Sequence, residues 1–141
     1  MTLQLTPAHA EEELLLDTHF SAGDLAKLRL RVDEIAAIAG LIGSRRAEFV
    51  LAMHEVACNA VRHGGGSGSL KLYLGPGTLR CQVTDEGPGF DEDVIPCVPP
   101  ALETSESGRG LWLVRHVTDH MRIVKGPVGT DVTYAMRLSV T

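Results

Sequence analysis

A tract of six small residues, Gly64 to Ser69, separates two kinds of hydrophobic pattern. Before the tract, apolar residues recur every three or four positions over 22–41 and again from Ser44 onward, which predicts two amphipathic helices. After it, apolar and polar residues alternate on both sides of Gly75–Gly77, which predicts a β-hairpin. Because glycines this dense do not continue a helix, the tract itself is predicted to be a loop.

The rest of the sequence predicts a strand at each end and one more helix. Glu11 to Phe20 has the composition of a strand, and the Ser21 hydroxyl is placed to cap the helix that follows, as Ser44 is for the second helix. Asp85 to Ser107 has no sustained periodicity, which predicts a long irregular loop. The closing segments are a third helix and two strands, expected over residues 111–121, 123–125 and 131–140. Together these elements predict one α+β domain over 1–141, a two-layer sandwich in which three helices cover a mixed, mostly antiparallel sheet.

Composition excludes several classes of protein. The 13 Lys and Arg residues against 18 Asp and Glu residues give a net charge of −5, which argues against direct binding to nucleic acid or to an anionic membrane. No apolar run approaches the ~18 residues of a membrane span, and Met1 to Ala10 lacks the features of a signal peptide, so we expect a cytoplasmic location. The three cysteines, Cys58, Cys81 and Cys97, form no Cys-x-x-Cys motif, and we interpret them as small buried hydrophobic residues.

The first polar cluster is Glu55 and Asn59 on the second predicted helix. Residues four apart lie on one face of a helix, so a carboxylate and an amide oxygen point to the same place. Magnesium takes few protein oxygens and keeps several waters, which suits an Asn ligand beside a Glu that deprotonates a hydroxyl or a water. The alternative for this pair alone is a solvated polar face.

Two glycine-rich clusters follow. The first comes directly after a strand, where a carboxylate can accept a hydrogen bond from an exocyclic amine and glycines allow close approach; its residues are Asp85, Gly87 and Gly89. The second opens the third helix, where backbone N–H groups bind anions; its residues are Gly108, Arg109, Gly110 and Leu111. Taken singly, the first is also typical of an ordinary turn and the second of a capped helix start.

The order of these clusters, with Gly129-Thr130 before the last strand, resembles the GHKL ATPase superfamily and its Bergerat ATP-binding fold. The resemblance covers about residues 20–138 and is strongest to the short anti-sigma-factor serine/threonine-protein kinases; the segment that carries it most clearly is 52–64, AMHEVACNAVRHG. The resemblance implies ATP and Mg²⁺ as cofactors, with Glu55 as the catalytic base, Asn59 as the metal ligand and His63 as a nucleotide contact. It implies that the adenine is bound by Asp85, Gly87, Gly89 and Thr130. It places Gly108, Arg109, Gly110 and Leu111 at the phosphates and makes 91–107 the ATP lid.

The same resemblance implies an activity and its partners. Such proteins sequester a sigma factor and use ATP to phosphorylate a serine of a small anti-anti-sigma protein with a STAS domain. Partner contacts are expected mainly on the first helix, where Arg29 and Arg31 are the charged candidates, and a homodimer is possible through that helix and the preceding strand. Little of the chain lies outside the nucleotide module, which favours a regulator over the multidomain members of the superfamily.

The expected lid departs from that family in its charge. It contains five acidic residues and no Lys or Arg, whereas stabilising a transferred phosphoryl group calls for positive charge. Two alternatives to the kinase therefore stay open: an ATP-dependent module that sequesters its partner without transfer, and a free ATP hydrolase in which Glu55 activates water.

Overall fold

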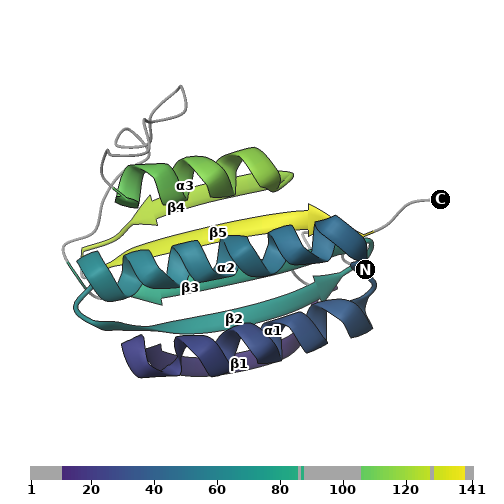
Figure 1. The fold of residues 1–141 in the computed structure, drawn as a ribbon, viewed down its shortest axis with the longest axis horizontal. Helices are drawn as coiled ribbons and strands as arrows, with labels where there is room; N and C mark the ends of the chain where they lie inside the picture. The colour runs from purple at the N-terminus through teal and green to yellow at the C-terminus, as the bar shows by residue number, and fades with distance from the viewer. Residues whose placement is uncertain (1–10, 86, 88–105, 128, 139–141) are drawn as a thin grey trace, which may run out of the picture.

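The computed structural model describes residues 11–85, 87, 106–127 and 129–138, and it forms two layers (Figure 1). Helices cover one face of a five-stranded sheet, as the α+β prediction requires. The elements in chain order are β1 (Glu13–Ser21), the short 3-10 helix η1 (Ala22–Asp24), α1 (Leu25–Ala39), α2 (Gly43–His63), β2 (Ser67–Gly75), β3 (Thr78–Asp85), α3 (Glu106–Val117), β4 (His120–Lys125) and β5 (Thr130–Arg137).

The strands lie in the order β1-β2-β3-β5-β4, and every neighbouring pair is antiparallel. The described sheet is therefore wholly antiparallel rather than mixed. Between β3 and β5 the register pairs Asp85 with Thr130, so the last residue of one strand lies beside the first residue of the other. This pairing brings two segments 45 positions apart to one end of the sheet.

Several predicted boundaries are wrong by a few residues. The glycine tract is a loop only as far as Gly66, because Ser67 already pairs with Ser21 and starts β2. The third helix ends at Val117, and Met121 lies in β4 opposite Tyr134. In each case pairing within the sheet outweighs the local pattern.

One of the two predicted helix caps differs from the structure. Ser21 is the N-cap of η1, as predicted, and it forms a capping box with Asp24, whose carboxylate accepts the backbone N–H and the hydroxyl of Ser21 at 2.9 and 3.2 Å. The second helix begins one residue before Ser44, at Gly43, after an N-cap at Ile42 that makes no side-chain capping bond. A capping hydroxyl at Ser44 is therefore not what starts α2.

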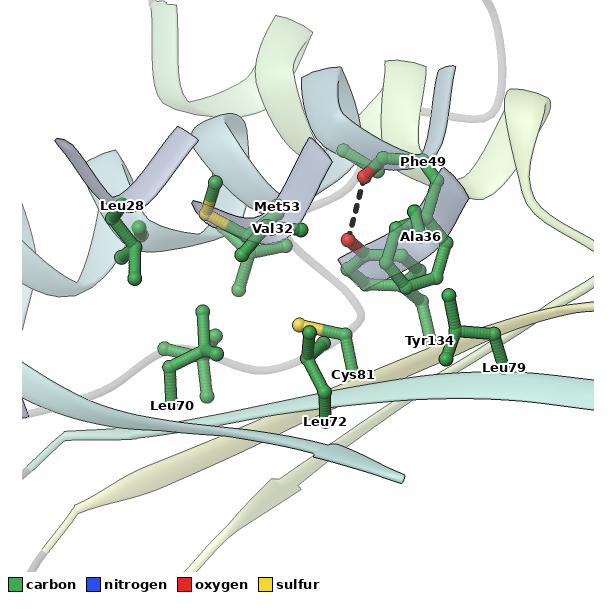
Figure 2. Close-up of a cluster of buried hydrophobic side chains, with 14 of the residues drawn as sticks. Leu28, Val32, Ala36, Phe49, Met53, Leu70, Leu72, Leu79, Cys81 and Tyr134 are labelled. Atoms are coloured by element: carbon green, nitrogen blue, oxygen red, sulfur yellow. Dashed lines mark hydrogen bonds between the residues drawn. The ribbon is translucent and has the colours of Figure 1, made fainter. Parts of the chain in front are cut away.

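The core lies between the helices and the inner face of the sheet (Figure 2). Tyr134 is the largest fully buried side chain among the described residues, and its hydroxyl donates to the backbone oxygen of Phe49 at 2.7 Å and ties β5 to α2. Cys81 on β3 points into the same core and is fully buried, and this burial raises the pKa of its thiol to about 12. For Cys81, the interpretation as a small buried hydrophobic residue is confirmed.

An ion-pair cluster around Asp119 joins the start of α2 to the end of β5. The Asp119 carboxylate accepts the Arg137 backbone N–H and an Arg45 guanidinium N–H, both at 2.7 Å, and Arg45 also donates to the Arg137 carbonyl at 3.0 Å. The Arg137 N–H, and after it Arg45, lowers the pKa of Asp119 below its usual value.

We expect Asp119→Asn to lower the free energy of unfolding by about 1 kcal/mol at neutral pH, a modest value because the cluster is partly exposed to solvent. A carboxylate with a lowered pKa in the folded protein stabilises it above the ordinary value of about 3.9. That contribution is lost as the pH falls through the lowered pKa. Urea denaturation of both proteins across this range checks the prediction, and an unchanged difference at acidic pH would contradict it.

Candidate functional site

One end of the site is built on the C-terminal half of α2. Glu55 and Asn59 lie one turn apart, and Asn59 is 2% exposed. The Asn59 side-chain N–H donates to the Glu55 backbone oxygen at 3.0 Å, which fixes the amide. Its buried Oδ1 has no hydrogen-bond partner among the described residues. The fixed amide therefore offers a buried oxygen of the kind that binds a hard cation such as Mg²⁺.

Gly110 brings the beginning of α3 against these two residues. A Cβ atom at position 110 would lie 2.5 Å from Glu55 Oε1 and 3.6 Å from Asn59 Nδ2. A side chain at position 110 would therefore displace the Glu55 carboxylate from the place it occupies here. The structure therefore joins two clusters that the sequence keeps 51 positions apart.

The other end of the site is the strand pair Asp85 and Thr130. Both residues are nearly fully buried, at 5% and 1% exposure. Asp85 Oδ1 accepts the Gly87 backbone N–H at 2.9 Å, whereas the buried Thr130 Oγ1 has no hydrogen-bond partner among the described residues. A carboxylate beside an unpaired hydroxyl can hold a polar group that both donates and accepts, such as the edge of a heterocyclic base.

Two glycines seat Asp85 against the end of α2. A Cβ atom at Gly64 would collide with the Asp85 side chain, and one at Gly87 would collide with the Gly64 backbone and lie 2.7 Å from the His63 carbonyl oxygen. The two ends of the site thus lie along one helix. From residue 55 to residue 64 the helix rises about 14 Å. This length suits an elongated ligand with different groups at its two ends.

The remaining predicted residues fall in three groups. His63 is the last residue of α2, with its carbonyl oxygen close to Gly87. Leu111 is 2% exposed, so its side chain is part of the packing of α3. Gly89 and residues 91–105 of the lid lie outside the described residues. The last two residues of the predicted lid, 106 and 107, belong to α3. Gly108 and Arg109 are in the first turn of that helix, and the Arg109 side chain is not described.

Sequence reasoning missed a cavity of about 430 Å³ between α2 and α3. Glu55 and Gly110 line it together with His54, Cys58 and Trp112. Cys58 is only partly buried, so its interpretation as a small buried hydrophobic residue is wrong. The available signal was its spacing, because Cys58 stands four residues after His54 and three after Glu55.

Comparison with known proteins places this arrangement in a family. The family model of the histidine kinase-like ATPase domain matches residues 19–136. The chain therefore belongs to the histidine kinase-like ATPase domain family, which is a family of nucleotide-binding domains. No curated protein matches the sequence significantly.

Solved structures agree with this fold. The RsbU and RsbW domains of Rv1364c from Mycobacterium tuberculosis align with 88% of this chain at a TM-score of 0.63 and 24% identity. The alignment covers 32% of that solved chain, so this chain spans about a third of its length. The catalytic domain of histidine kinase ThkA, in a nucleotide-free form, aligns with 87% of this chain and 97% of its own at a TM-score of 0.51 and 14% identity.

Within the described residues, no helix has both the length and the apolar character needed to cross a membrane.

Proposed function

We propose that this chain is a cytoplasmic anti-sigma-factor regulator that binds ATP with Mg²⁺ and transfers the γ-phosphoryl group to a serine of a STAS-domain partner. The observation that carries the nucleotide-binding part is a pair of buried oxygens that have no hydrogen-bond partner among the described residues. They are Asn59 Oδ1 on α2 and Thr130 Oγ1 at the start of β5, opposite Asp85. A buried polar atom without a partner costs about 1–3 kcal/mol, so a ligand that pairs both atoms is strongly favoured.

The residues present fit such a ligand. Asp85 and Thr130 would hold the adenine edge, with Gly64 and Gly87 allowing close approach. Asn59 Oδ1 would supply the protein oxygen for Mg²⁺, which would neutralise charge on the phosphates. Glu55 would take the proton of the partner serine, since its carboxylate lies beside Gly110, the fifth residue of α3. The first turn of α3, which precedes Gly110, would bind phosphate oxygens through its backbone N–H groups.

The surface of α1 supports a protein partner. Leu30 and Ile38 are 71% and 87% exposed on α1, and Ile42 just beyond it is 64% exposed. Arg31 on the same helix is also exposed. Large apolar side chains beside a cation are typical of protein interfaces. We assign this surface to the sigma factor and the STAS-domain protein, and the edge strand β1 beside it to a homodimer contact.

Nucleotide binding is tested by calorimetry on an Asp85→Asn variant. We expect the wild-type chain to bind ATP in the presence of Mg²⁺. The variant should bind it at least about tenfold more weakly, because a neutral amide replaces the charged acceptor of the adenine amine.

Asp131→Asn is the matched control. Asp131 lies on the adjacent strand, and its carboxylate accepts hydrogen bonds from Gln82 and Thr84 at 2.8 and 3.4 Å. This variant should bind ATP as the wild type does. Wild-type protein that takes up neither ATP nor ADP would overturn the proposal.

A further inference from the structure

The cavity between α2 and α3 contains a cysteine and a histidine in contact. Cys58 Sγ lies 3.4 Å from His54 Nε2, one helical turn apart on α2. Cys58 is partly buried and lines the cavity of about 430 Å³. The thiolate is the reactive form of cysteine, and a neighbouring imidazole can take the thiol proton. Cys58 therefore combines a proton acceptor with space for a reaction partner.

Two buried nitrogens beside this pair have no hydrogen-bond partner among the described residues. They are His54 Nδ1 and Trp112 Nε1, and both residues line the cavity. The indole N–H can only donate, and when Nε2 accepts the thiol proton, Nδ1 carries a hydrogen as well. Trp112 is also held in place by stacking on His116, with ring centroids 4.0 Å apart. Two fixed, unpaired donors favour a ligand with acceptor oxygens.

We propose that Cys58 is a modification site, at which a low-molecular-weight thiol bearing carboxylate and amide groups is attached through a mixed disulfide and seated in this cavity. Its thiol part reaches Cys58 Sγ, and its oxygens pair with His54 Nδ1 and Trp112 Nε1.

The co-reactant is a symmetric low-molecular-weight disulfide. His54 Nε2 takes the proton from Cys58 Sγ, and the thiolate attacks one sulfur of the disulfide. The bond between the two small-molecule sulfurs breaks as the bond to Cys58 forms. The departing thiolate takes up the proton, and Cys58 is oxidised while one half of the disulfide is reduced.

The consequence for activity rests on the proposed function. Glu55 and Gly110 line the same cavity, so a bound adduct occupies the approach to the Glu55 carboxylate. Adenine would be held at Asp85 and Thr130, at the other end of α2. The adduct should therefore prevent phosphoryl transfer to a partner serine. Because Gly110, which is placed at the phosphates, lines the same cavity, the adduct should also weaken ATP binding.

The test treats a Cys97→Ser variant of the whole 141-residue chain with oxidised glutathione. Cys97 lies outside the described residues, and its removal leaves Cys58 and Cys81 as the only two thiols. Intact mass and peptide mapping should find one glutathione, on Cys58. Cys81 is the internal control, because it is fully buried and should react only after denaturation. His54→Gln should slow the reaction of Cys58 by about tenfold, because the thiol loses the base that favours the thiolate.

Each outcome decides one of the two proposals. A folded chain in which Cys58 gains no glutathione, or gains it no faster than Cys81, would overturn the modification site. An adduct that forms on Cys58 and leaves transfer unchanged would overturn its regulatory consequence. A reduced chain that transfers no phosphate to a bound partner would instead refute the kinase, while the mass measurement on Cys58 would stand.

Discussion

Glu55→Gln is expected to reduce phosphoryl transfer to the partner serine by about 10²–10⁴-fold while leaving ATP affinity nearly unchanged. Glutamine has the size of glutamate, so the contact of residue 55 with Gly110 is kept. It cannot take up the serine proton, which is the role proposed for the Glu55 carboxylate. Binding is measured by calorimetry and transfer by the rate at which labelled γ-phosphate reaches the partner.

Glu48→Gln is the matched control for this experiment. Glu48 lies two turns earlier on α2 and is also partly buried, so the same chemical change is made on the same helix outside the site. It should leave both binding and transfer as in the wild type. Transfer that survives in Glu55→Gln would show that another group takes the proton.

Gly110→Ala is the second change with a large expected effect. The new methyl group would lie 2.5 Å from Glu55 Oε1, and this carboxylate, at the end of a flexible side chain, would have to move. Displacing a catalytic group by about 1 Å costs on the order of 10²-fold in rate. We therefore expect transfer to fall by about that factor in a chain that still folds.

Gly23→Ala provides the comparison for Gly110→Ala. A Cβ atom at Gly23, in η1, meets nothing within 4 Å, so the same substitution should leave transfer unchanged there. Circular dichroism of both variants should match the wild type. Equal transfer rates in the two variants would mean that the close approach of α3 to Glu55 does not matter for the reaction.

The local part of the fold was predictable because it depends on periodicity. The apolar stripe of α2 and the alternation of β2 and β3 each require only neighbouring residues, and the structure confirms both. Boundaries set by distant partners were not predictable in this way. Met121 has helical spacing from Val117 but pairs with Tyr134 in β4, and Ser67 follows three glycines but pairs with Ser21.

The residues of the candidate site likewise divide into those predictable from local spacing and those brought together by distant contacts. Glu55 and Asn59 lie on one face because of their spacing, so the sequence alone predicts that they share one side of the helix, and the family resemblance adds their roles. The contact between Gly110 and Glu55 and the pairing of Asp85 with Thr130 depend on tertiary packing and strand register, and only the family resemblance anticipated them. Cys58 was misjudged because composition says nothing about which cysteine lines a cavity.

Labelled γ-phosphate moving from ATP to a serine of a bound STAS-domain partner is the most direct measurement of the proposed activity. The partner is first captured with the wild-type chain in the presence of ATP and Mg²⁺, and the label is then followed. We predict phosphoserine on the partner, and none with Glu55→Gln. Nucleotide-dependent capture without transfer would contradict the kinase and favour a sequestering module, and label recovered only as free phosphate without any partner would favour an ATP hydrolase.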